Sequence, residues 1–234
     1  MRLVADTMIS IIVPALNEAD TIEATLRQLQ DCRNRGHEVI VVDGGSTDAT
    51  VQLARPLADR VSHSSPGRAS QMQTGADMAR GELLWFLHAD TRIPGNACHA
   101  ILAALASGNR QWGYFDVQFP ERIRLLGLVA WMMNSRSRLT RIATGDQGIF
   151  VTRDLFRRVA GFRLIPLMED IALSRSLKRH SQPACIGMKL TTSSRRWRRH
   201  GILRTILLMW SLRFAYFLGI SPATLAKYYK PGAS

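Results

Sequence analysis

Two side chains that could bind a metal ion follow a short apolar segment in the first half of the chain. The segment Leu83–Leu87 is apolar throughout, and His88 and Asp90 follow it two positions apart. Side chains two positions apart in an extended strand point to the same face. Asp90 could therefore hold Mg²⁺ or Mn²⁺ against a diphosphate, with His88 as a further ligand or as an orienting group. A purely structural imidazole at a strand end is the alternative for His88.

Two adjacent acids, Glu169 and Asp170, could supply a general base. They precede the helical pattern IALSRSLKRH. One of the two carboxylates could face a cleft and deprotonate a hydroxyl group within hydrogen-bond reach. The alternative is that both acids only stabilise the N-terminal dipole of that helix.

A glycine-rich turn follows a second apolar segment. Asp43 comes directly after Val39–Val42, and Gly44 and Gly45 follow it. The carboxylate could accept hydrogen bonds from a base or ribose while the glycines allow close approach of the backbone. A turn aspartate that caps the next helix is an equal alternative. The chain has neither GxGxxG nor a P-loop, so phosphates must be bound in another way.

Two later segments are also polar enough to contact a ligand. TGDQGIF places Asp146 and Gln147 beside glycines, which suits hydroxyl recognition or a tight turn. SSRRWRRHG groups four arginines around Trp197, which suits pyrophosphate binding with stacking. A solvated basic loop is the alternative for the second segment.

The elements that must position these residues alternate between strand and helix. The sequence predicts strands at 8–13, ended by Pro14, at 39–42, in DRVSHSS and at 83–87, with helical patterns between them. Strands that are apolar throughout and separated by helices predict a parallel sheet. QWGYFDVQF and GIFV predict later strands that make the sheet mixed. We expect an α/β fold with a mixed, mainly parallel sheet, helices on both faces and ligands outside the carboxyl ends of the strands.

Four of these segments together resemble the family-two glycosyltransferases with the GT-A fold. IIVPALNEADTI resembles the opening strand and loop of that family, and VIVVDGGSTDAT its nucleotide-binding turn. LLWFLHADT resembles the metal-binding DxD region, and MEDIALSRSLKR the ED motif. The resemblance covers roughly residues 8 to 200. HADT, GRASQMQTGA and GDQGIFV are most similar to the small subgroup of radical-SAM/selenodomain-associated transferases.

The resemblance implies an inverting glycosyltransferase that moves a sugar from a nucleotide-diphosphate donor to an acceptor hydroxyl with Mg²⁺ or Mn²⁺. It implies that Asp170 is the base with Glu169 beside it, that Asp90 and His88 lie at the metal, and that Asp146 and Gln147 lie on the acceptor side. The implied donor-binding residues are Pro14, Ala15, Asn17, Glu18, Asp43, Gly44, Gly45, Arg68, Ala89, Arg196 and Trp197.

The chain departs from the family pattern at two positions. His88 replaces the first acid of DxD, which leaves the identity of the metal open. Arg196 and Trp197 resemble the end of the QxxRW motif of processive synthases, but Ser193 stands where that motif has Gln. Processive polymerisation is therefore not implied.

The positive charge is concentrated near the C-terminus. The net charge is +13, but residues 1–170 carry 19 basic against 18 acidic side chains, whereas residues 171–234 carry twelve basic and no acidic ones. We expect a catalytic domain over 1–200 and a basic, apolar helical tail over 201–234. The apolar segment 202–220 is interrupted by Arg204 and Arg213, so it is too short to span a bilayer.

The basic tail predicts an anionic partner, but the sequence does not specify which one. It suits an anionic membrane surface or a lipid-linked acceptor, and we expect no nucleic acid. Docking on the body of the protein or on a second subunit, as a homodimer, is an equal alternative. The expected location is cytoplasmic, peripheral on the cytoplasmic face of the membrane, because no secretion signal is recognised. Cys32, Cys98 and Cys185 have no spacing that indicates a disulfide framework or a zinc site.

Two other functions compete with this interpretation. A sugar-phosphate nucleotidyltransferase could share the sheet and an acid-bound metal, but PALNEA lacks the GxGxR loop expected after the first strand. A non-catalytic membrane- or polyanion-binding protein would use the basic tail without turnover of a donor.

Overall fold

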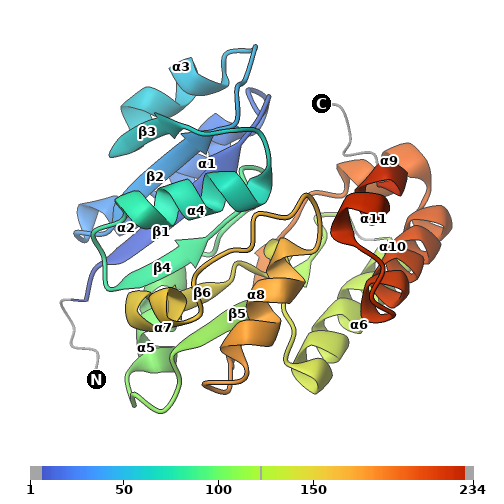
Figure 1. The fold of residues 1–234 in the computed structure, drawn as a ribbon. Coiled ribbons are helices and arrows are strands. Elements are labelled where there is room, and N and C mark those ends of the chain that lie inside the picture. The colour runs from blue at the N-terminus through green and yellow to red at the C-terminus, as the bar shows by residue number, and fades with distance from the viewer. Residues whose placement is uncertain (1–6, 122, 230–234) are drawn as a thin grey trace.

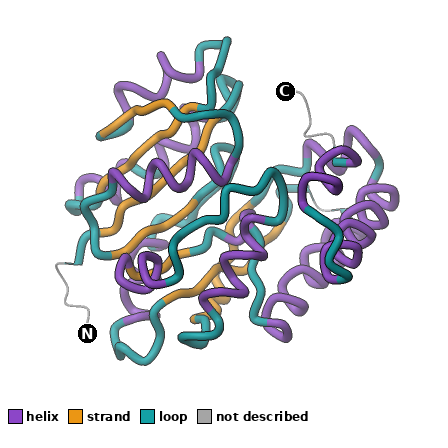
Figure 2. The backbone as a smooth tube through the Cα atoms, in the orientation of Figure 1, coloured by secondary structure: helices purple, strands orange, loops and turns teal. Residues whose placement is uncertain are grey.

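The fold is built on one sheet whose strands lie side by side across the molecule (Figures 1 and 2). A computed structural model describes residues 7–121 and 123–229, except for the side chains of residues 196, 199 and 200. Within these residues seven strands are ordered β3-β2-β1-β4-β6-β5-β7. They are β1 (Ile9–Ala15), β2 (Glu38–Asp43), β3 (Arg60–His63), β4 (Leu83–Phe86), β5 (Trp112–Gln118), β6 (Phe150–Thr152) and β7 (Ala184–Thr191).

The sheet is mixed and mainly parallel. β1 pairs in parallel with β2 and β4, β2 with β3, and β5 with β7. Only β6 runs antiparallel to its neighbours, β4 and β5. The predicted fold class is therefore confirmed.

Pro14 lies inside β1, so the prediction that it ends the strand was wrong. Pro14 pairs with Val42 of β2. On the other side of β1, the carbonyl of Ile12 accepts a hydrogen bond from the amide of Leu87. Backbone groups alternate sides along a strand, so the nitrogen of Pro14 points the same way, past the end of β4. The missing N–H therefore costs no ladder hydrogen bond.

Helices cover both faces of the sheet because the strands are apolar on both sides. Ile11 and Val13 pack with α1, α2, α3 and α5, whereas Ile12 packs with α4, α7 and α8. The helices are α1 (Ile22–Gln28), α2 (Gln30–Asn34), α3 (Thr50–Ala54), α4 (Arg68–Met78), α5 (Ala97–Leu105), α6 (Arg124–Thr140), α7 (Arg153–Arg158), α8 (Glu169–Leu177), α9 (Arg195–His200), α10 (Ile202–Phe217) and α11 (Pro222–Tyr228), with short 3₁₀ turns at Arg55–Leu57 and Gly145–Gln147.

The C-terminal helices gather with α6 on the side of the molecule away from β3 (Figure 1). Leu212 of α10 and Leu225 of α11 form a small core with Leu167, Met168 and Ile171 around the start of α8. The guanidinium of Arg175 lies 5.2 Å from the centre of the Tyr216 ring. Among the described residues no helix is long and apolar enough to cross a membrane.

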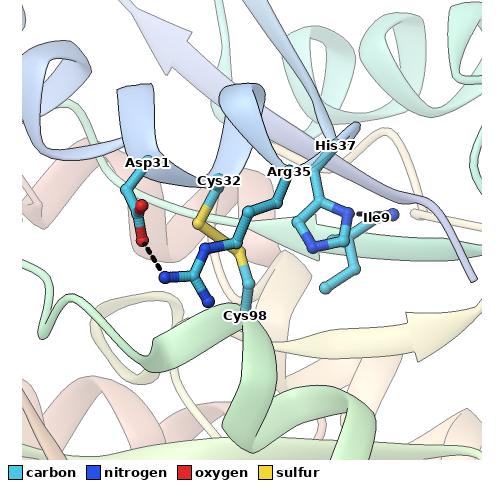
Figure 3. Close-up of a disulfide and its surroundings, with 6 residues drawn as sticks. All are labelled: Ile9, Asp31, Cys32, Arg35, His37 and Cys98. Carbon is cyan, nitrogen blue, oxygen red and sulfur yellow. Dashed lines mark hydrogen bonds and ion pairs between the residues drawn. A yellow bond between two sulfur atoms is a disulfide. The ribbon is translucent and has the colours of Figure 1, made fainter. Parts of the chain in front are cut away.

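A disulfide joins Cys32 of α2 to Cys98 of α5 (Figure 3), although the spacing of the cysteines in sequence did not indicate one. The two cysteines are 66 residues apart, and only the fold places α2 and α5 on the same face of the sheet. Near the disulfide, Nδ1 of His37 accepts a hydrogen bond from the amide of Ile9. Burial, helped by the charge of Arg35, lowers the pKa of His37.

Candidate active site

The loops after β1 and β2 are tied to each other at the carboxyl edge of the sheet. The amide of Asn17 donates to the hydroxyl of Ser46, and Oδ1 of Asn17 accepts from the amide of Thr47. Asn17 has a left-handed backbone with φ of 51°, which asparagine tolerates better than most residues. The buried side-chain amide of Gln71, on α4, also donates to the carbonyls of Ala15 and Val42. These contacts hold Pro14, Ala15 and the turn after Asp43 in one rigid edge.

Asp43 shapes the glycine-rich turn. Its carboxylate accepts hydrogen bonds from the amides of Gly45 and Ser46, and Nδ1 of His63 lies 3.2 Å away. Burial by itself would raise the pKa of Asp43, but the hydrogen bonds from Ser46 and Gly45 outweigh it, and the pKa is lowered. Gly44 lies close to Gln71, since a Cβ there would be 3.0 Å from its Nε2. Contact of this turn with a nucleoside stays a prediction.

His88 forms the centre of a second set of contacts. Its Nδ1 lies 3.4 Å from Oδ1 of Asp146, and its Nε2 lies 3.4 Å from Nη1 of Arg68. The imidazole packs directly over Gly145, where a Cβ would be 2.5 Å from Nε2. Thr192 also donates to Asp146. His88 and Asp146, which are 58 positions apart in sequence, therefore act as one unit.

The pKa values of His88 and Asp146 shift in opposite directions. Burial disfavours a charged imidazole, but the carboxylate of Asp146 outweighs burial, so the pKa of His88 is raised. Burial would also raise the pKa of Asp146, yet His88 and then Arg68 hold it well below its ordinary value. Both ring nitrogens of His88 already face protein partners, Nδ1 facing Asp146 and Nε2 facing Arg68. His88 is thus better suited to positioning Asp146 than to metal binding.

Asp170 lies next to this unit and has the properties of a general base. Its Oδ2 accepts from the amide of Gly145 at 2.9 Å and its Oδ1 from its neighbour Ile171 at 2.7 Å. Burial and the negative charge of Glu169 raise the pKa of Asp170 to about 6. Catalytic bases work best when their pKa lies near the working pH. The void behind Asp170 and His88 is lined by Gly145 and by the apolar Met72, Phe86, Ile149 and Phe162.

Two arginines counter these acids. Nε of Arg68 lies 3.1 Å from Oε1 of the buried Glu169. Burial would lower the pKa of Arg68, but Glu169 and other acids raise it further above its ordinary value. Arg136 of α6 interacts electrostatically with Asp170, although burial lowers its pKa. The sequence analysis missed Arg136, because an arginine within an ordinary amphipathic helix carries no motif.

Arg195 is the third arginine of the site, and the sequence analysis missed it as well. One nitrogen, Nη2, lies 2.7 Å from Oε2 of Glu18 and 3.3 Å from Oδ2 of Asp90. Two carboxylates from different loops therefore converge on one cation. Hard divalent cations prefer such oxygen ligands. Among residues 7–121 and 123–229 no group of three His, Cys, Asp or Glu side chains is arranged to hold a metal ion.

The remaining predicted residues take different places. Ala89 is buried, and its carbonyl accepts from the hydroxyl of Thr25. The ring of Trp197 packs edge-to-face against Phe119 at 5.7 Å. Gln147 is fully buried, and its side-chain oxygen accepts from the hydroxyl of Ser137, which leaves Asp146 as the accessible member of that pair. The side chain of Arg196 lies outside the described part of the chain.

A cavity of about 420 Å³ lies away from this cluster. It is found at the opposite end of β4, where Glu82 precedes the strand, and it is lined by none of the residues above. Five arginines contribute to its wall: Arg80, Arg110, Arg153, Arg157 and Arg158. The candidate site is instead the open edge formed by the loops at the carboxyl ends of β1, β2 and β4.

The chain is similar to curated glycosyltransferases of mycobacteria. It is 33% identical over 115 residues to an uncharacterized glycosyltransferase of Mycobacterium tuberculosis, a match that covers 45% of this chain and 44% of that protein. It is 35% identical over 96 residues to a PGL/p-HBAD biosynthesis glycosyltransferase of Mycobacterium bovis, covering 38% of each. The match therefore spans less than half the length of these relatives.

Solved structures with the same fold are more distant in sequence. The glucosyl-3-phosphoglycerate synthase of Mycobacterium tuberculosis, solved with Mn²⁺, UDP and glucosyl-3-phosphoglycerate, has a TM-score of 0.60 at 21% identity, over 80% of this chain and 71% of that one. A mannosyltransferase of Pyrobaculum calidifontis, solved with GDP-Man and Mn²⁺, has a TM-score of 0.62 at 23% identity, over 95% and 65%. Both support the GT-A architecture of the sheet.

The family model for glycosyl transferase family 2 matches residues 10–154. This range is more than half of the chain, and it contains nearly all of β1, β2 with Asp43, β4, and the segments that carry Glu18, Asp90 and Asp146. The segment with Asp170 and Arg195 lies beyond the match but packs against those loops. By this match the chain belongs to glycosyl transferase family 2.

Proposed function

We propose that this chain is an inverting glycosyltransferase with Asp170 as its general base. The observation that carries the proposal is the environment of Asp170, whose pKa of about 6 leaves the carboxylate ionised, yet basic, at neutral pH. Backbone amides fix both of its oxygens at the carboxyl edge of the sheet. Asp90 and Glu18 reach the same edge from the loops after β4 and β1.

The reaction then follows in one displacement. Asp170 takes the proton of an acceptor hydroxyl, and the oxygen attacks the anomeric carbon of the donor sugar. The bond between that carbon and the diphosphate breaks, and the nucleoside diphosphate leaves with the electron pair. Attack opposite to the leaving group inverts the anomeric configuration. Arg68 and Arg195 are placed to offset the negative charge that develops on the diphosphate.

We assign the donor side to the rigid edge around Asn17 and Asp43, and the metal to Glu18 and Asp90. The convergence of these two carboxylates on Arg195 supports a cation site, because a divalent ion could take the place of the guanidinium. When bound, Mg²⁺ or Mn²⁺ would neutralise the diphosphate. We keep His88 as the residue that positions Asp146, and Asp146, which is 40% exposed, as the acceptor-side carboxylate.

We further propose that residues 1–200 form the catalytic unit and that the acceptor is lipid-linked. The exposed apolar side chains of α10, which lies within the acid-free segment 171–234, support an amphiphilic acceptor. Membership of glycosyl transferase family 2 favours sugar transfer over nucleotidyl transfer.

The test compares donor turnover with donor binding. Wild type, Asp170→Asn and the control Asp154→Asn, an exposed acid on α7, are incubated with UDP-glucose, UDP-GlcNAc or GDP-mannose and Mn²⁺, and release of the nucleoside diphosphate is measured. Asp170→Asn should keep the thermal stabilisation by the nucleotide but lose turnover, as removal of a general base costs about 10² to 10⁴ in rate. Full turnover by Asp170→Asn would overturn the assignment. Folded wild type that neither turns over any donor nor is stabilised by any nucleotide would favour the non-catalytic binding protein.

A further inference from the structure

Helix α10 has an inner face that packs on the protein and an outer apolar face that lies in solvent. Thr205 and Leu212 are buried, and they are seven residues apart on the inner face. The outer face consists of five large apolar residues that are each at least 60% exposed. These residues, the α10 stripe, are Leu203, Leu207, Trp210, Phe214 and Phe217.

The spacing of the α10 stripe places all five side chains in one line. They recur at intervals of four and three residues, which is the repeat of a single helical face. Trp131 on the adjacent helix α6 is 64% exposed, and Leu128 is 49% exposed one turn before it. Monomeric proteins seldom expose apolar groups so densely, and such patches mark interaction surfaces. The stripe therefore requires an occupant.

The charges beside the stripe indicate what the occupant is. At 100° per residue, Arg204 and Arg213 lie on opposite sides of the stripe. No acidic residue occurs anywhere after Asp170. Helices that lie in a membrane interface have this arrangement, with aliphatic and aromatic groups toward the acyl chains and cations toward anionic headgroups. A second copy of the chain would bring the like-charged borders of two stripes together, which is unfavourable.

We infer that the α10 stripe is a membrane-docking surface, specific for bilayers with anionic headgroups, on which the helix lies flat. Its inner face links this surface to the site, because Leu212 packs against Met168 and Ile171, which flank Glu169 and Asp170 in sequence. In consequence, and here the inference rests on the proposed function, the acceptor hydroxyl belongs to an amphiphile held at the bilayer surface.

Vesicle co-sedimentation tests the surface directly. The full chain is mixed with vesicles of phosphatidylcholine alone or with about 30% phosphatidylglycerol, an anionic lipid. Wild type should bind the anionic vesicles more strongly, and salt should weaken this binding. Leu207→Glu/Phe214→Glu should lower the partition coefficient roughly tenfold or more, since two buried apolar contacts are lost. Leu164→Glu/Leu139→Glu, at two exposed leucines outside the stripe, is the control with the same charge change.

Other outcomes separate this inference from the proposed function. Nucleotide-induced thermal stabilisation should be unchanged in the stripe variant, and Asp90→Ala should still bind vesicles. If folded wild type binds no anionic vesicles, or if the control variant loses as much binding as the stripe variant, the inference is wrong. A dimer in light scattering that the stripe variant abolishes, without vesicle binding by wild type, would make the surface a contact between two copies.

Discussion

Neutralising Glu169 and neutralising Arg68 should shift the pH profile of turnover in opposite directions, because these two residues are the charged neighbours of Asp170. Turnover requires the ionised carboxylate, so kcat/KM of wild type should rise with pH around the pKa of about 6. At one pH unit below that pKa only about a tenth of Asp170 is ionised, and kcat/KM should fall to about one-tenth of its plateau. The low-pH limb of the profile therefore reports on Asp170.

The magnitude follows from the causes of the shift. The pKa of Asp170 is raised from 3.8 to about 6, which corresponds to about 3 kcal/mol between its two protonation states. Burial is the larger cause and Glu169 the second, whereas Arg68 acts in the opposite direction. Glu169→Gln should therefore move the limb to lower pH, by less than the whole shift because burial remains. Arg68→Gln should move it to higher pH.

The assay is kcat/KM for donor turnover, measured across the pH range on wild type and both variants. Arg175→Gln, at a cation of α8 whose guanidinium lies over the ring of Tyr216, is the control that should leave the limb in place. The reasoning is refuted if Glu169→Gln and Arg68→Gln shift the limb in the same direction. It is also refuted if neither variant shifts it, since the group that titrates would then not be Asp170.

Three further perturbations have defined outcomes. Arg195→Ala frees the carboxylates of Glu18 and Asp90 and should tighten Mn²⁺ binding in the absence of nucleotide, measured by calorimetry. Weaker Mn²⁺ binding would contradict a cation site at these carboxylates. Gly145→Ala forces a Cβ to within 2.5 Å of His88. It should lower the melting temperature and turnover together, because overpacking costs about 1–3 kcal/mol. Unchanged turnover would count against the positioning role of the imidazole. Reduction of the disulfide between Cys32 and Cys98 should destabilise the fold by about 2–4 kcal/mol, read from denaturant unfolding with and without reductant.

Each of these perturbations has a matched control. Arg198→Ala removes a cation of the same helix, α9, that makes a long contact of 3.9 Å with Glu121, and Mn²⁺ binding should not respond. Gly127→Ala adds a methyl group where nothing lies within 4 Å. Cys185→Ser removes the free thiol, and reductant should still destabilise this variant. If reductant no longer destabilises Cys185→Ser, the destabilisation does not come from the disulfide.

The parts of the site that lie directly after a strand were accessible from sequence. His88 and Asp90 follow β4, and Asp43 is the last residue of β2, as expected where continuous apolar segments identify buried parallel strands whose carboxyl ends share one edge. Glu169 and Asp170 could be placed because acids that precede a helical pattern mark its first turn. The position of Pro14 inside β1 could not be predicted from sequence. It is tolerated because β1 extends past the end of β4, and this depends on how the strands pair, which is a tertiary property.

The contacts between distant segments could not be predicted. Arg195 was identified at the carboxylates only from the structure, because four arginines around one tryptophan are equivalent in sequence. Cys32 and Cys98 meet only after α2 and α5 pack on the same face. The sequence predicts a helix over α10, but it does not show which face of that helix packs on the protein, because this depends on the position of α8.

Thermal stabilisation by nucleotide tests the central claim, a donor site at the carboxyl edge, most directly. UDP, GDP, CDP and dTDP are each added with and without Mn²⁺ to wild type and Asp90→Ala. At about 100 times its dissociation constant, a nucleotide should stabilise wild type by roughly 2.7 kcal/mol, seen as a higher melting temperature. We predict a Mn²⁺-dependent increase with one nucleotide that Asp90→Ala loses. No increase with any nucleotide in folded wild type, or an equal increase in Asp90→Ala, would contradict the account.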